Sequence, residues 1–324
     1  MTPIEQATQR NFDIAAFDGP AGPNATVRAH ASATATRWRA FVQMTRPSVV
    51  ALVFFTGVPM LALNTGAWPP LGTAAAILFG IALAAAASSV FNAWIERDLD
   101  TRMERTRGRP LPSGRVQPRE ALIFAWLLTI ASLVVMTLAG HPLGVVGAAA
   151  TIAFYVFVYT IWLKPRTPLN IVIGGAAGAA PPLIVDAALN GSVGLMSLNL
   201  FVLVFLWTPP HFWAISLFRK EDYRAAGFPM LPITHGNEAT RRRIVFYALS
   251  MVPFATLPAL TGHLSHAYGA VALAISGWFL WRCVHLWRER TDKAARGVMG
   301  ASLVYLFVIC AAMALDLLLA SANQ

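Results

Sequence analysis

Long apolar runs are the feature that most limits what this chain can fold into. Of its 324 residues 56% are hydrophobic and only 12% are charged. Nine runs are long enough to cross a bilayer as helices, and helices satisfy their own backbone hydrogen bonds where no water is present. The sequence therefore predicts an all-α polytopic membrane protein with nine transmembrane helices, over residues 48–66, 71–93, 120–139, 143–162, 168–189, 193–216, 243–262, 265–284 and 298–319.

The basic residues predict how these helices are oriented. Lys and Arg gather before the first run, between the second and third, and after the fourth, sixth and eighth. The loops at 64–70, 140–142, 190–192 and 262–268 contain neither residue. The positive-inside rule then places the N-terminus in the cytoplasm and the C-terminus outside. This pattern accounts for the net charge of +10 without nucleic acid, and anionic lipid headgroups of the bilayer are a secondary partner.

The N-terminal segment differs from the rest of the chain. Residues 1–36 are polar and rich in Ala and Thr, which predicts a disordered cytoplasmic tail over residues 1–40, followed by one membrane domain over 41–324. Acidic residues in this tail argue against a mitochondrial transit peptide. The composition suits a bacterial inner membrane, and the mitochondrial inner membrane would follow the same physics in a eukaryote.

Three oxygen-bearing side chains lie four residues apart at the end of the second run. Asn92, Glu96 and Asp100 share one face if the helix continues through them. An amide and two carboxylates are hard ligands, and Mg²⁺ binds through one or two carboxylates together with substrate phosphates. A solvated helix end whose acids pair with nearby arginines is the alternative. We expect a catalytic Mg²⁺-diphosphate site, because acids at the membrane edge are costly unless they are paired or functional.

Several basic residues are expected on the same side of the membrane as these acids. The arginines that follow Asp100 suit phosphate oxygens, since guanidinium groups match their geometry. Each cation could equally be a positive-inside anchor. The candidates for substrate binding are Arg46, Arg105, Arg107, Lys164 and Arg166, with Lys164 and Arg105 preferred; Arg109 lies in the same run.

A resemblance to a known family comes from several strings of residues. They are Thr45-Arg46-Pro47, Asn92 to Pro110, Leu163 to Pro182, Trp207 to Ala214, Arg219 to Tyr223 and Gly227 to Pro232. Together they resemble the UbiA superfamily of intramembrane prenyltransferases, from about residue 40 to the last helix. The string from Trp207 to Ala214 is more similar to the haem-modifying branch than to the branch that prenylates aromatic acids.

The resemblance implies a nine-helix bundle around a central cavity that opens sideways to the lipid. It assigns Mg²⁺ and the prenyl diphosphate to Asn92, Glu96 and Asp100, with Glu96 standing where many relatives have Asp. A second acidic motif of the family aligns with Arg219 and Tyr223, so a second fully carboxylate Mg²⁺ site does not carry over. Asp222 remains as a further catalytic candidate, and Arg219 and Tyr223 join the substrate-binding candidates.

The reaction implied by the resemblance is a farnesyl transfer. The farnesyl group of farnesyl diphosphate would pass to a vinyl group of haem b, with addition of water, to give haem O and pyrophosphate. A haem A synthase acting downstream is the partner enzyme that this implies. His211 could orient the haem iron, act as a general base, or be a buried hydrogen-bonded histidine. Aromatic residues that could stabilise a carbocation, or simply pack, are Trp94, Tyr155, Tyr159, Phe212 and Trp213.

Two other functions compete with this interpretation. The acceptor could be an aromatic acid or a chlorin, and nothing in the physics of the residues selects haem. A membrane transporter could also carry acids and prolines in its helices. However, the acids cluster at one membrane face, and only Asp186 and Asp316 are predicted in or beyond the distal half of the spans. A proton or ion relay across the membrane is therefore not expected.

Overall fold

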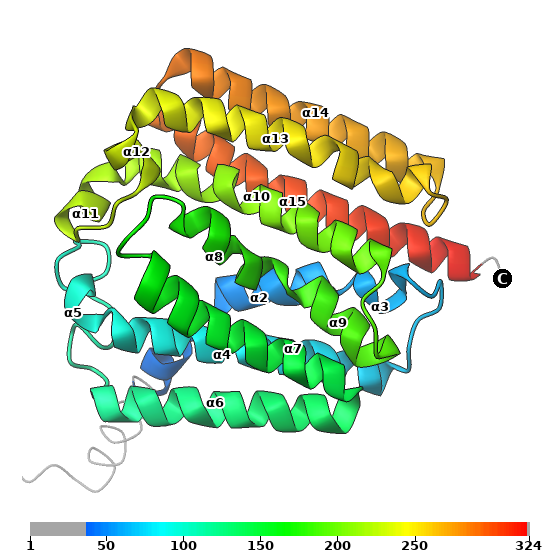
Figure 1. Ribbon diagram of the computed structural model, residues 1–324, viewed down its shortest axis with the longest axis horizontal. Coiled ribbons are helices and arrows are strands. Elements are labelled where there is room, and N and C mark those ends of the chain that lie inside the picture. The colour runs from blue at the N-terminus through cyan, green and yellow to red at the C-terminus, as the bar shows by residue number, and fades with distance from the viewer. Residues whose placement is uncertain (1–36, 323–324) are drawn as a thin grey trace, which may run out of the picture. The chain divides into compact units, whose positions relative to one another are not determined.

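A computed structural model describes residues 37–322 of the chain. Contacts divide the chain into residues 1–40 and residues 41–324, and the second unit is the subject of this description. Most of the predicted N-terminal tail, residues 1–36, lies outside the described residues. Within the described part, the regular elements are all helices, as the apolar runs predict. Figure 1 shows long helices lying side by side.

Eight helical spans in residues 37–322 are long and apolar enough to cross a membrane, or up to nine if the bent pair Arg37–Met44 and Pro47–Leu63 counts as one span. The bounds of the elements are α2 Pro47–Gly57, α3 Met60–Leu63, α4 Leu71–Ile95, α5 Arg97–Asp100, α6 Pro118–Ala139, α7 Pro142–Ala153, η1 Phe154–Leu163, α8 Asn170–Ala179, α9 Pro181–Asn190, α10 Leu195–Phe218, α11 Lys220–Ala225, α12 Leu231–Thr234, α13 Gly236–Leu260, α14 His266–Glu289 and α15 Asp292–Ala322.

Proline sets several of the helix boundaries. Pro118, Pro142 and Pro181 each occupy the first turn of a helix, where the missing N–H costs nothing. The loop expected at 140–142 is a short turn between α6 and α7, and α8 passes into α9 at Pro181. The first predicted span is less regular than a single helix over 48–66, because α2 ends at Gly57 and α3 begins only at Met60, after Pro59.

The second half of the fourth predicted span is a π-helix. From Phe154 to Leu163 the turns are wider than in an α-helix, so each turn takes one residue more. The hydroxyl of Thr160 donates to the carbonyl of Tyr155, five residues earlier, at 2.8 Å. Gly174 on α8 leaves room for the ring of Tyr159, since a Cβ there would lie 2.1 Å from the ring. Periodicity at 3.6 residues per turn does not predict this register.

The two longest interhelical segments meet at one end of the bundle, which we call the basic end. Figure 1 shows α5, α11 and α12 there. Met103, from the segment after α5, is buried in one apolar cluster with Phe228 and Met230, from the segment after α11. Ile171 at the start of α8 completes the contact. The two segments therefore cap the same region of the bundle.

The two acids away from the basic end have structural partners. The buried Asp186 accepts hydrogen bonds of 2.6 to 2.7 Å from Asn64, Asn190, Ser197 and the Gly194 backbone. Asp316 accepts a hydrogen bond of 2.8 Å from the backbone N–H of Ser265. Each carboxylate therefore joins chain segments, and neither has the form of a relay for ions.

Candidate functional site

The three predicted ligands lie on successive turns where α4 passes into α5. The backbone leaves helical geometry at Glu96, with φ −90° and ψ 6°. The amide of Glu96 still donates to the Asn92 carbonyl at 3.0 Å, and that of Asp100 to the Glu96 carbonyl at 2.8 Å. The three side chains therefore keep the predicted four-residue stagger. All are buried, with relative exposures of 0% for Asn92, 4% for Glu96 and 1% for Asp100.

Each of these side chains meets a cation from another part of the chain. Arg46 donates to the Asn92 side-chain oxygen at 2.7 Å, and Lys164 Nζ lies 2.5 Å from Glu96 Oε1. Arg109 Nη1 contacts both oxygens of Asp100, at 2.9 and 3.2 Å. The three cations come from the start of α2, the end of η1 and the segment after α5, so only the fold brings them together.

The backbone at Arg46 and the electrostatics at Arg109 show how tightly this cluster is built. Arg46 has a φ of 54°, an uncommon conformation for a residue with a side chain, directly before Pro47. Burial lowers the pKa of the Arg109 guanidinium, and repulsion from Arg46 adds to this effect while Asp100 opposes it. Three cations therefore converge on two acids and one amide, an arrangement that suits a polyanionic ligand.

The donor chemistry of this cluster fits Mg²⁺. Asn92, Glu96 and Asp100 present hard oxygen donors, and Oε1 of Glu96 is buried beside the Lys164 ammonium. Among the described residues no group of three or more His, Cys, Asp or Glu side chains could hold a metal alone. A bound Mg²⁺ would thus take its remaining ligands from phosphate oxygens and water, which is its usual preference.

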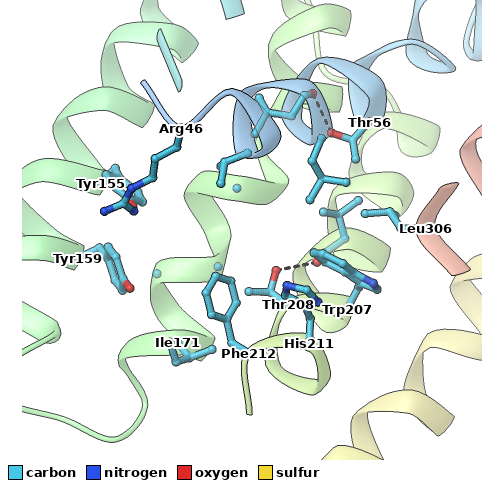
Figure 2. Close-up of a pocket in the computed structure, with 17 residues that line it drawn as sticks. Arg46, Thr56, Tyr155, Tyr159, Ile171, Trp207, Thr208, His211, Phe212 and Leu306 are labelled. Carbon is cyan, nitrogen blue, oxygen red and sulfur yellow. Dashed lines mark hydrogen bonds between the residues drawn. The ribbon is translucent and has the colours of Figure 1, made fainter. Parts of the chain in front are cut away.

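An apolar cavity opens beside the cluster. Arg46, Tyr155 and Tyr159 line one side of it, and Trp207, Thr208 and His211 line the opposite side, as Figure 2 shows. Between them the wall is mostly aliphatic or glycine, from α2, α8 and α15. Of the aromatic candidates Tyr155, Tyr159 and Phe212 line this cavity. Trp213 is buried against Tyr247 instead, and Trp94 stacks with Arg97.

His211 is held in one orientation on this cavity wall. Its Nδ1 lies 2.7 Å from the Ser302 hydroxyl, and its ring stacks on Trp207 with centroids 4.7 Å apart. The Ser302 hydroxyl donates its only hydrogen to the Met299 carbonyl at 2.6 Å. In the tautomer that keeps this Ser302–Met299 bond, Nδ1–H donates to Ser302 and the other ring nitrogen, Nε2, is unprotonated. An unprotonated Nε2 can accept a hydrogen bond or ligate a metal.

The candidates on the second long segment lie apart from the first cluster. Asp222 pairs with Arg219 at 3.6 Å, and both line a separate polar cavity between α10, α11 and the starts of α13 and α15. Tyr223 alone contacts the first segment, with its ring 5.9 Å from the Arg105 guanidinium. The structure therefore does not bring Asp222 and Arg219 to the Asn92 cavity.

The remaining basic candidates have different surroundings. Arg107 is exposed and pairs only with Glu104, at 3.9 Å. Arg166 is exposed and donates to the carbonyls of Ile161 and Trp162 at the end of η1. Of the arginines after Asp100 it is Arg109 that contacts the acids, and sequence reasoning had preferred Arg105. Helical periodicity could not predict which arginine faces the acids, because the segment from 101 to 117 is a series of turns and not a helix.

A comparison with models of protein families shows to which family this chain belongs. The model of the UbiA prenyltransferase family matches residues 51–320. The chain belongs to the UbiA prenyltransferase family. It is accordingly an enzyme of the prenyltransferase class. The family assignment covers every element from within α2 to nearly the end of α15, so both long segments and the cavity fall inside it.

Relatives within the family are similar over nearly the whole chain. A protein of Erythrobacter litoralis named protoheme IX farnesyltransferase is 43% identical over 90% of this chain and 96% of its own. A protein of the same name from Rhizorhabdus wittichii is 46% identical over 90% of this chain and 99% of its own. These identities confirm the resemblance to the UbiA family that the sequence strings indicated.

Solved structures share the fold at low sequence identity. A digeranylgeranylglyceryl phosphate synthase superposes with a TM-score of 0.72 at 17% identity, covering 87% of this chain and 99% of that one. A UbiA homologue from Archaeoglobus fulgidus, bound to DMAPP and Mg²⁺, gives a TM-score of 0.63 at 18% identity, covering 84% and 98%. The all-helical UbiA architecture is thereby confirmed.

Proposed function

We propose that this enzyme transfers the farnesyl group of farnesyl diphosphate to a vinyl group of haem b, with addition of water, giving haem O and pyrophosphate. The observation that carries this proposal is a cluster of two buried carboxylates and a buried amide with three partly buried cations, beside an apolar cavity that Arg46 lines. The relatives named protoheme IX farnesyltransferase support the donor and the acceptor. Related solved structures were determined with DMAPP or GPP together with Mg²⁺.

The diphosphate is proposed to bind where Arg46, Lys164 and Arg109 converge. Asn92, Glu96 and Asp100 would hold Mg²⁺, which when bound neutralises part of the charge on the departing diphosphate. Arg46 lines the cavity as well as contacting Asn92, so it can reach a phosphate oxygen at the boundary between polar and apolar regions. Electrostatic stabilisation of the leaving group is the main contribution that such a site can make.

The bond changes in the proposed reaction balance without a redox partner. The allylic C–O bond of the donor breaks, and its electron pair leaves with pyrophosphate. The haem vinyl group attacks the allylic carbon and forms a C–C bond, and water adds to the resulting cation and loses a proton. Tyr155 and Tyr159 line the cavity near Arg46, where their ring faces can stabilise positive charge by about 0.5–2 kcal/mol each.

His211 is proposed to orient the acceptor. Its unprotonated Nε2 follows from the Ser302 and Met299 hydrogen bonds, and a neutral imidazole is a common iron ligand. Trp207 stacks on this imidazole and so helps to hold its orientation. An aromatic acid or a chlorin is the alternative acceptor. A bacterial inner membrane as the location and delivery of the product to a haem A synthase belong to this same proposal.

Mass spectrometry of the pigments tests donor and acceptor together. Purified protein would be incubated with haem b, farnesyl diphosphate and Mg²⁺, and a haem heavier by one farnesyl group plus water is expected. Omitting Mg²⁺ should stop both the new haem and pyrophosphate release. Prenylation of an aromatic acid with haem left unchanged would retain the cluster and refute the haem acceptor. No product from folded protein with any acceptor would refute the proposed reaction.

A further inference from the structure

The second long segment reaches the diphosphate cluster through an aromatic ring. Its ion pairs are local, but the centroid of the Phe228 ring lies 4.9 Å from the Lys164 ammonium. Lys164 is the cation beside Glu96, at 2.5 Å. A ring within about 6 Å of an ammonium attracts it, because the face of the ring is electron-rich. Phe228 therefore connects the second segment to the cluster through a cation–π contact.

The end of α11 determines where this ring lies. Gly227 has a φ of 75°, a left-handed conformation that glycine adopts without strain. The backbone N–H of Gly227 donates to the Arg224 carbonyl at 3.0 Å, and the next N–H donates to the Tyr223 carbonyl, also at 3.0 Å. These two bonds form a Schellman motif, which brings the residue after the glycine back against the helix. Phe228 is that residue, and it is only 4% exposed.

Apolar side chains from three parts of the chain hold the Phe228 ring in place. Met103 comes from the segment after α5, Ile171 from the start of α8 and Met230 from just before α12, and each is buried. This packing leaves the ring little freedom to move away from Lys164. A lysine side chain is a flexible four-carbon stem, so the ring is a fixed surface against which it can rest.

The surroundings of Lys164 suit a cation that changes partners when a ligand binds. Its ammonium contacts Glu96, and the rings of Phe228 and Tyr159 lie 4.9 and 5.8 Å away. In the proposed function Glu96 ligates a metal, so the ammonium turns to a phosphate oxygen. A ring face attracts positive charge without requiring one hydrogen-bond direction, so the ammonium can turn and still stay at the cluster. A lysine without this contact would lose more conformational freedom on binding the diphosphate.

We propose that Phe228 is a positioning residue for diphosphate binding, and that the face of its ring holds the Lys164 ammonium in place for the phosphate oxygens. The second segment then serves the cluster through this ring and not through its acids. This inference rests on the proposed function and adds to it a residue that acts through Lys164.

Binding of a non-reacting donor analogue tests the inference. The affinity for farnesyl thiolodiphosphate with Mg²⁺ would be measured by calorimetry for protein carrying one, two or three fluorine atoms on the Phe228 ring. Fluorine withdraws electrons from the ring face with little change in shape, so the affinity should fall stepwise, by about three- to tenfold in total. Phe228→Leu should give a similar loss, with KM for farnesyl diphosphate raised and kcat little changed. Met230→Leu is the matched control, because it alters the same buried cluster and leaves the ring in place.

Removing the lysine separates positioning from packing. In Lys164→Met protein all the fluorinated rings should give the same affinity, since the charge that the ring attracts is gone. Among variants that melt cooperatively, a fluorine trend that persists without Lys164, no trend with Lys164 present, or an equal loss in Met230→Leu would overturn the inference.

The same measurements distinguish failure of this inference from failure of the proposed function. If the protein without substitutions bound no farnesyl analogue, the proposed diphosphate site would be refuted, and the role of Phe228 with it. A fluorine trend in binding without any haem product would support the role of Phe228 and refute only the proposed acceptor.

Discussion

The two long segments at the basic end carry similar charges but use them differently. In the first segment the acids Glu96 and Asp100 are buried. Glu96 is paired with Lys164, which is distant in the sequence, and Asp100 is paired with Arg109, which follows a series of turns. In the second segment Arg219 pairs with Asp222, and Arg224 with Glu221, three residues away on the same short helix. Local pairs on an exposed helix turn form without tertiary structure.

This difference supports the first segment, and not the second, as the proposed ligand site. Burying an ion costs several kcal/mol, and only good geometry or a further charged group compensates this cost, so the buried acids of the first cluster call for a functional explanation. Exposed pairs such as Arg224–Glu221 contribute about 0–1 kcal/mol and call for no such explanation. A polyanion with its metal would repay the cost of burial at the first segment.

Removing one acid from each segment should give the largest difference in activity between the two segments. Asp100→Ala is expected to lower kcat for pyrophosphate release by roughly 10³-fold, because it removes a proposed metal ligand and leaves Arg109 without its partner. Asp222→Ala is expected to lower kcat by no more than about fivefold, since its pair is partly exposed. Comparable losses in two well-folded variants would show that both segments bind the diphosphate.

The next largest effect should separate two arginines of the same segment. Arg109→Ala is expected to reduce kcat/KM by about 10²-fold, because a partly buried cation that contacts both oxygens of Asp100 is lost. Arg107→Ala, two residues earlier, should change kcat/KM by less than twofold, as its only ion pair is exposed. Steady-state kinetics with varied farnesyl diphosphate would measure both. A larger loss for Arg107→Ala would contradict the assigned contacts.

A smaller effect is expected from the cations that follow η1. Lys164→Met should raise KM for farnesyl diphosphate by about tenfold, because a charged hydrogen bond contributes about 1.5–3 kcal/mol. Arg166→Met removes only the contacts to the last carbonyls of η1, so its expected result is a slightly lower melting temperature with unchanged KM. If Arg166→Met raised KM as much as Lys164→Met, the diphosphate would have to lie outside the cavity mouth.

Much of the fold could be predicted from the sequence because hydrocarbon imposes simple rules. The apolar runs predicted most helices and the short loop at 140–142, since helices are the form that these segments take in lipid. Two features escaped prediction. Pro59 divides the first span, and the π-helix at 154–163 changes which residues face the cavity. Both depend on local packing, such as Gly174 against Tyr159, and hydropathy does not encode it.

The candidate site was predictable where it follows a helix and unpredictable where it depends on loops. Asn92, Glu96 and Asp100 share a face because four residues make about one turn, and the pattern alone indicated this. Which cation meets each acid could not be predicted, because Arg46, Lys164 and Arg109 are joined only by tertiary contacts. The pairing of His211 with Ser302, 91 residues later, has the same origin.

The smallest expected effect concerns the contact between the two long segments. The Arg105 guanidinium lies 5.9 Å from the Tyr223 ring, and both groups are partly open to water. A double-mutant cycle of Arg105→Gln and Tyr223→Leu, measured by kcat/KM, should give a coupling free energy of about 0.5–1 kcal/mol. A coupling near zero would mean that the second segment covers the cavity through the apolar Phe228 cluster alone. A coupling above about 2 kcal/mol would mean that both side chains hold one substrate group, and the second segment would then belong to the diphosphate site after all.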